Sequence, residues 1–117
     1  MATRIPKNHA SFQWQELTQA LGIVGRGEER SVCGVSTDSR SLAPGEVFFA
    51  LRGDRFDAHD FVEKLPEGFV AVVDQHYVDN LSADAIDGLA SRLSLFVVPD
   101  TLIALGNLAL FHRQRWG

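Results

Sequence analysis

The chain has 117 residues and a mass of 12.9 kDa, the size of one ordinary domain. It is 45% hydrophobic and 22% charged, which predicts a folded domain rather than a disordered one. A net charge of -4, with no long Lys/Arg run, argues against nucleic acid as a main partner. The sequence lacks the apolar run of a membrane helix and the pattern of a secretory signal. The single cysteine, Cys33, excludes an internal disulfide, fits a cytoplasmic location and is predicted to lie in the core.

The first half of the chain predicts a mobile polar start, one helix and two strands. Ser11 can cap the helix, Gly22 can end it, and Pro44-Gly45 is a strong turn signal before the second strand. That strand is apolar on both faces, which is typical of a strand covered on each side. The predicted ranges, in chain order, are 1–10, 11–21, 32–36 and 47–51.

The second half alternates helices with strands. Pro66 ends a short helix, and Pro99 ends the last strand before a long helix that Asp100 can cap. The predicted ranges are helix 58–65, strand 69–73, a weak helix 82–92, strand 95–98 and a helix to about 115. This alternation predicts an α/β fold with a small, mostly parallel or mixed sheet and flanking helices.

The last helix is unusually apolar around its circumference. One stripe at helical spacing contains Leu102, Leu105, Leu108 and Ala109, and further apolar residues such as Leu110 lie outside it. A helix that is apolar over much of its girth needs cover on more than one side. We therefore expect a further domain or a partner to pack there.

No self-contained catalytic motif is present. The sequence lacks GxxxxGK[ST], GxGxxG and GxSxG, so it predicts neither a phosphate-cradling loop nor a nucleophile elbow. The histidines show no metal-ligand spacing, so a metal site is not expected.

Two polar segments follow the first two predicted strands, TDSR at 37–40 and GDRFDAH at 53–59. Ligands of open α/β sheets bind outside the carboxyl ends of the strands, so neighbouring parallel strands would place both segments at one edge. Guanidinium groups match phosphate oxygens, and hydroxyls and glycine-rich backbone add donors. The segments can therefore hold a phosphorylated small molecule through the arginines at 40, 52 and 55.

A purely structural role for the same residues stays open at this point. Asp38 and Ser39 can simply cap a turn, Arg40 can pair with an acid, and Asp57 can cap the following helix. His59, between two acids, is interpreted as a hydrogen-bonded loop anchor rather than a general base.

Residues 36–61, STDSRSLAPGEVFFALRGDRFDAHDF, resemble the N-terminal domain of the Mur ligases, which build the peptide of bacterial peptidoglycan on a UDP-linked sugar. The shared pattern is DSR, then PG with an acid and apolar residues, then A-x-x-G, then D-x-H-x-F. The resemblance extends over roughly 12–116. FDAHDF is more similar to the MurF type, whereas MurE types more often carry DGH where Ala58 stands.

The resemblance implies a three-domain enzyme. The first domain binds the UDP end of the substrate, the second binds ATP and magnesium, and the third binds the incoming amino acid or dipeptide. The substrate carboxylate becomes an acyl phosphate, which an amine attacks to form an amide. By this resemblance residues 1–117 match the first domain only. We therefore expect an inactive fragment without a cofactor of its own, whose last helix packs on the central domain.

The resemblance also implies the substrate-binding residues. They are Thr37, Ser39, Arg40, Asp54, Arg55, Phe56 and His59. Ser39 would donate a hydroxyl to the nucleotide, Arg55 would reach the diphosphate, and Phe56 would pack on uracil or ribose. Arg40 and His59 are expected to position the loops. No catalytic residue is assigned.

Three alternatives remain at the level of the sequence. One is a MurE-type ligase that adds a diamino acid or lysine. The second is a stand-alone nucleotide-binding or interaction module without catalysis. The third is a structural scaffold domain whose loops bind no ligand.

Overall fold

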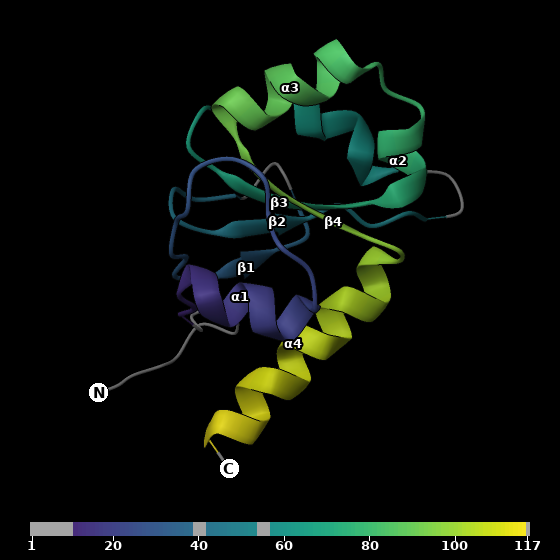
Figure 1. Cartoon of the computed structure of the whole chain (residues 1–117). Coiled ribbons are helices and arrows are strands. Elements are labelled where there is room, and N and C mark those ends of the chain that lie inside the picture. The colour runs from purple at the N-terminus through teal and green to yellow at the C-terminus, as the bar shows by residue number, and fades with distance from the viewer. Residues whose placement is uncertain (1–10, 39–41, 54–56, 117) are drawn as a thin grey trace.

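The computed structural model describes residues 11–38, 42–53 and 57–116, and it contains a parallel four-stranded sheet in the order β1-β2-β3-β4 (Figure 1). The strands are β1 (Val35–Ser36), β2 (Val47–Phe49), β3 (Val70–Asp74) and β4 (Ser94–Val98). The helices are α1 (Trp14–Leu21), the 3-10 helix η2 (Ala58–Lys64), α2 (Gln75–Asp79), α3 (Ala83–Arg92) and α4 (Thr101–Trp116). The predicted α/β class is confirmed, and the sheet proves wholly parallel.

Helices cover both faces of the sheet (Figure 1). Successive side chains of a strand point to opposite faces, and β3 divides accordingly. Val70 and Val72 join the core under α1 and α4, whereas Ala71 and Val73 join the core under η2 and α3. This double cover explains why the strands read as continuous apolar runs.

Helix α1 begins three residues later than predicted. Phe12 and Val32 pair in an antiparallel bridge, with N–H···O distances of 2.9 and 2.8 Å. The chain is therefore extended at the position where Ser11 was expected to cap a helix. The helix ends as predicted, because Gly22 adopts φ 71° and donates its N–H to Thr18.

The same bridge explains the wrong prediction for Cys33. Strand β1 has only two residues, since Val32 pairs with Phe12 and not with β2. Cys33 therefore lies outside the sheet and its side chain is exposed. Helix α2 was not predicted from the sequence. It is a short helix capped by Asp74 at the end of β3.

The inward face of α4 also differs from the predicted stripe. Thr101, Ala104 and Leu108 are buried, whereas Leu102 is 66% exposed and Ala109 is also exposed. The expectation of an uncovered apolar surface is confirmed, because Ile103 and Leu110 are 63% and 50% exposed. We call Leu102, Ile103 and Leu110 the outer face of α4. Among the described helices, none has the length and apolar content needed to cross a bilayer.

The loop after α1 is fixed against β4. Arg26 and Leu95 exchange two backbone hydrogen bonds, of 2.7 and 2.8 Å. The next residue, Gly27, has φ +99°, and a Cβ there would lie 2.7 Å from the carbonyl oxygen of Leu93. Only glycine satisfies both the conformation and this close backbone approach.

We predict that Gly27→Ala lowers the free energy of unfolding by about 1–3 kcal/mol, because a side chain at this φ is strained and meets backbone. The matched control is Gly88→Ala in α3, where a Cβ meets nothing within 4 Å. It should raise the same free energy by roughly 0.5–1 kcal/mol. Urea unfolding followed by circular dichroism measures both. Equal effects of the two substitutions would contradict the assignment.

Candidate functional site

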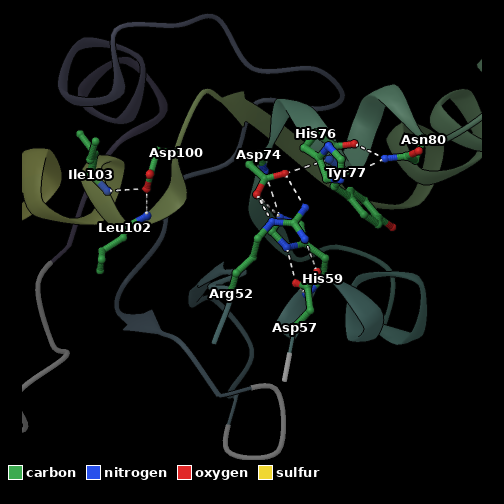
Figure 2. Close-up of polar contacts among 10 residues, drawn as sticks. All are labelled: Arg52, Asp57, His59, Asp74, His76, Tyr77, Asn80, Asp100, Leu102 and Ile103. Atoms are coloured by element: carbon green, nitrogen blue, oxygen red, sulfur yellow. Dashed lines mark hydrogen bonds and ion pairs between the residues drawn. The ribbon is translucent and has the colours of Figure 1, made fainter. Parts of the chain in front are cut away.

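The carboxyl ends of all four strands lie at one edge of the sheet, because every strand pair is parallel. Thr37 follows β1, Arg52 follows β2, Asp74 ends β3, and Asp100 follows β4. Polar side chains from distant parts of the sequence therefore meet at this edge (Figure 2). The two segments singled out from the sequence both leave strands here, as predicted for neighbouring parallel strands.

The predicted binding residues fall into two groups. Thr37 is exposed at the end of β1, and His59 is buried at the start of η2. Ser39, Arg40, Asp54, Arg55 and Phe56 lie outside the described residues. The turn beside Thr37 is fixed by Ser36, whose hydroxyl accepts from the Asp38 N–H at 3.1 Å and donates to the Asp38 carbonyl at 3.0 Å.

Arg52 is bound by two carboxylates. Its Nε and Nη2 atoms donate to the two oxygens of Asp74 at 2.6 and 2.9 Å, in a bidentate arrangement. Its Nη1 atom also donates to Asp57. The Asp74 side chain is 8% exposed and that of Arg52 is 38% exposed. One of the three arginines expected to serve a phosphate is thus already occupied within the protein.

His59 connects the same two carboxylates from the interior. Its Nε2 atom accepts the main-chain N–H of Asp74 at 3.0 Å, which places the ring proton on Nδ1. Nδ1 then donates to Oδ1 of Asp57 at 2.7 Å. The same Asp57 oxygen accepts the main-chain N–H of His59 at 2.9 Å and caps η2. Both ring nitrogens are used internally, as a loop anchor requires.

Tyr77 closes this cluster on its inner side. Its ring packs on His59 with centroids 5.0 Å apart, and its main-chain N–H donates to Asp74 at 2.8 Å. Its hydroxyl is buried without a partner among the described residues. Burial raises the pKa of Tyr77 to about 12, and the nearby acids Glu63 and Asp60 add to the shift.

The sequence reasoning missed Asp74 and Tyr77. Asp74 carried a usable signal, because an acid directly after a buried apolar strand stands at the ligand-binding edge of a parallel sheet. Tyr77 carried none, since its place depends on the short helix α2.

The carboxylates of the cluster are stabilised in their charged form. Burial acts to raise the pKa of Asp74, but hydrogen bonds from Arg52 and from the Tyr77 N–H outweigh it and lower the pKa below its ordinary value. For Asp57, burial is likewise outweighed by hydrogen bonds from the backbone and ring of His59, so its pKa is also lowered. Both groups remain acceptors at neutral pH.

A pocket of about 220 Å³ opens beside the cluster. Arg52 and Asp74 line one side, and Pro99 to Leu102 line the other. Two N–H donors of the first turn of α4 are already used, because Asp100 accepts those of Leu102 and Ile103 at 2.9 and 3.1 Å. Among the described residues, no group of three or more possible ligands could hold a metal ion.

We predict that acid unfolds the protein partly through this cluster. The folded-state pKa values of Asp57 and Asp74 lie below the ordinary 3.8, so their stabilisation is complete above that value. It is lost as pH falls through the lowered folded-state values. The free energy of unfolding should therefore decline between about pH 5 and pH 2, and Asp74→Asn should reduce this slope. Urea titrations at several pH values measure it, and an unchanged slope would contradict the role of Asp74.

Comparison with known proteins finds ligases among the relatives of the chain. Residues 31–113 match the family described as "Mur ligase family, catalytic domain". The UDP-N-acetylmuramoyl-tripeptide–D-alanyl-D-alanine ligase of Synechocystis sp. is 35% identical over 97 residues, which are 82% of this chain and 20% of that protein. The UDP-N-acetylmuramoyl-L-alanyl-D-glutamate–2,6-diaminopimelate ligase of Geobacillus thermodenitrificans is 33% identical over 87 residues, 74% of this chain and 16% of that protein.

A solved structure agrees with these matches. The UDP-N-acetylmuramoylalanyl-D-glutamyl-2,6-diaminopimelate–D-alanyl-D-alanyl ligase of Acinetobacter baumannii superposes with a TM-score of 0.70 and 27% identity. The alignment covers 97% of this chain and 23% of that one. This chain therefore spans about a fifth of the length of the relatives it matches. The match over residues 31–113 shows that the chain belongs to the Mur ligase family.

Proposed function

We propose that this chain binds the UDP end of a UDP-N-acetylmuramoyl-peptide for a ligase of peptidoglycan precursor synthesis. The observation that carries the proposal is that the chain leaves β1 at Thr37 and Asp38 and leaves β2 near Arg52 and Gly53 at one edge of the sheet, because β1 and β2 are parallel neighbours. By the resemblance to the Mur ligases, these two segments contain the residues expected to contact the nucleotide. Resemblance to D-alanyl-D-alanine ligases favours the MurF type, which adds that dipeptide.

The proposed contacts follow from the chemistry available at the edge. Thr37 and Ser39 offer hydroxyls to the nucleotide, Arg55 offers a guanidinium to the diphosphate, and Phe56 offers an aromatic face to uracil or ribose. Arg52 is unsuited to the phosphate, because Asp74 and Asp57 already hold it. Arg40 and His59 position the loops. The diphosphate that joins uridine to the sugar carries two negative charges, so donors without an acidic partner are needed.

The complete ligase would carry out the chemistry. We propose that it is a cytoplasmic enzyme that uses ATP and magnesium, and that this chain alone is inactive. The described residues offer no group of possible metal ligands, and the sequence has no phosphate loop, so both cofactors would bind elsewhere in the ligase. The diaminopimelate ligase relative keeps the MurE type as the second candidate. Activity of the full-length protein with a tripeptide or a dipeptide substrate separates the two.

We predict that uridine ligands bind at the carboxyl edge. In the isotope-labelled chain, UDP-N-acetylmuramoyl-tripeptide and UMP should shift the amide signals of Thr37, Asp38 and Gly53, whereas AMP should not. NMR titration to millimolar ligand measures this. Equal responses to UMP and AMP, or shifts confined to the opposite edge of the sheet, would refute the proposed site.

We further predict that Arg55→Ala weakens binding of the UDP ligand by roughly tenfold or more. A hydrogen bond to a charged group contributes about 1.5–3 kcal/mol, and 1.4 kcal/mol corresponds to a factor of ten. Arg26→Ala is the matched control, because Arg26 pairs with Leu95 near the amino end of β4. Calorimetric dissociation constants for both variants decide the point, and equal losses would contradict the assignment of Arg55.

We also propose that the central domain of the ligase covers the outer face of α4. Ile103→Asp should change the stability of the present chain by less than about 0.5 kcal/mol, because the side chain is 63% exposed. In the full-length ligase the same change should lower stability and activity, since it would bury an unpaired charge. Asn107→Asp, at an exposed polar position of the same helix, is the control. A full-length protein insensitive to Ile103→Asp would disprove this contact.

A further inference from the structure

We propose that Asp74 is a positioning residue for the nucleotide site: through Arg52 and His59 it fixes both ends of the segment between Arg52 and Asp57. This inference rests on the proposed function, in which that segment contacts the substrate. Asp74 does not touch the ligand in this account. It determines where the segment leaves the sheet and where it returns.

The first anchor lies where the chain leaves β2. Arg52 is the third residue after Phe49, the last residue of β2, and its guanidinium reaches across to the end of β3. Two parallel hydrogen bonds to Asp74, of 2.6 and 2.9 Å, restrict both the position and the rotation of the guanidinium plane. A single-point contact such as a lysine would restrict the position alone.

The second anchor lies where the chain returns. Asp57 binds His59 through one oxygen and Arg52 through the other. His59, 1% exposed, receives the main-chain N–H of Asp74 on its far nitrogen. The end of β3 is therefore connected to the returning chain through a rigid aromatic ring that cannot shift without losing both bonds (Figure 2).

The two anchors form a closed circuit. Starting from Asp74, the bonds run to Arg52, then to Asp57, then to His59, and back to the Asp74 main chain. A backbone hydrogen bond from Ala58 N to Leu51 O, of 2.9 Å, lies across the same opening. Arg52 and Asp57 are thus held before any ligand arrives, which lowers the entropy that binding must remove at these two positions.

The charge balance supports positioning over direct ligand binding. The circuit contains two carboxylates and one guanidinium, with a neutral His59, so it carries excess negative charge. Such a group repels a phosphate and attracts none. What the circuit supplies is geometry, in the way that buried outer partners orient the ligands of other sites.

The test uses Asp74→Asn, which keeps the size of the side chain and its capacity to cap α2, and removes the bidentate acceptor. Native-state amide exchange reports the circuit directly. We expect the amides of Ala58 and His59 to exchange about tenfold faster or more, while Leu95, bound to Arg26 in the opposite part of the sheet, stays protected. Affinity for UDP, measured on the same samples, should fall by about tenfold.

A matched control and a rescue separate positioning from general loosening. Asp87→Asn removes another acid that meets an arginine, but at 3.5 Å and with the side chain 72% exposed, and should change neither readout. His59→Gln keeps an acceptor and a donor at the end of the side chain, whereas His59→Leu keeps neither. UDP affinity should be retained better in His59→Gln than in His59→Leu. Should Asp74→Asn not fold, Arg52→Lys, which keeps the charge without the fork, replaces it.

Each result decides between the claims. Faster exchange at Ala58 and His59 together with weaker UDP binding supports the inference. Unchanged exchange overturns it, and so does faster exchange with unchanged affinity. If the unsubstituted chain does not bind UDP, the proposed function fails and the positioning role for a nucleotide fails with it, while the exchange data still show whether Asp74 holds the circuit.

Discussion

All five residues of β3 are buried, because helices cover the sheet on both faces. A strand in this position cannot present a polar side chain along its length without burying it in an apolar core. Polar chemistry is therefore confined to the strand ends. The parallel arrangement then brings the carboxyl ends together at one edge, and everything that makes this edge a candidate site follows from the double cover of the sheet.

Asp74 is the point at which the apolar strand meets this polar edge. Its carboxylate is nearly inaccessible to solvent, yet both oxygens accept hydrogen bonds. Arg52 donates to each of them, and the main-chain N–H of Tyr77 donates to one. The Arg52 side chain is 38% exposed, so solvent screens the pair and its net contribution to stability is about 1 kcal/mol or less. Two well-packed apolar side chains of similar volume would stabilise the fold at least equally. The arrangement is therefore better explained by the geometry it imposes than by its contribution to stability.

Much of the fold was predictable because it depends on local apolar pattern. Strands β2, β3 and β4 lie where short apolar runs end in glycine, proline or acid, and α3 lies within the weak periodicity of 82–92. The wrong predictions between Ser11 and Ser36 share one cause, which is pairing between distant residues. The Phe12–Val32 bridge shortened both the first helix and the first strand, and it exposed Cys33. No local pattern contains that information.

For the candidate site, the segments were predictable from the sequence but the bonds between them were not. The segments around Thr37 and Asp57 follow strands, so a rule about strand ends finds them. The bond between His59 and the Asp74 main chain spans 15 residues, and that between Arg52 and Asp74 spans 22, so neither can be read from spacing. Sequence reasoning therefore grouped Arg52 with the phosphate-binding arginines, whereas in the structure it binds Asp74 and Asp57.

That internal use of Arg52 constrains where an anionic ligand can lie. Asp74 ends β3, Asp100 follows β4 and caps the first turn of α4, and Asp57 binds the same Arg52 as Asp74, so carboxylates line this part of the edge. Unit charges of like sign at 4 Å repel by about 4 kcal/mol near a protein surface, more than a single hydrogen bond returns. A diphosphate is therefore disfavoured over β3 and β4. In the proposed site a diphosphate would therefore approach from the β1 side, where Thr37 is exposed.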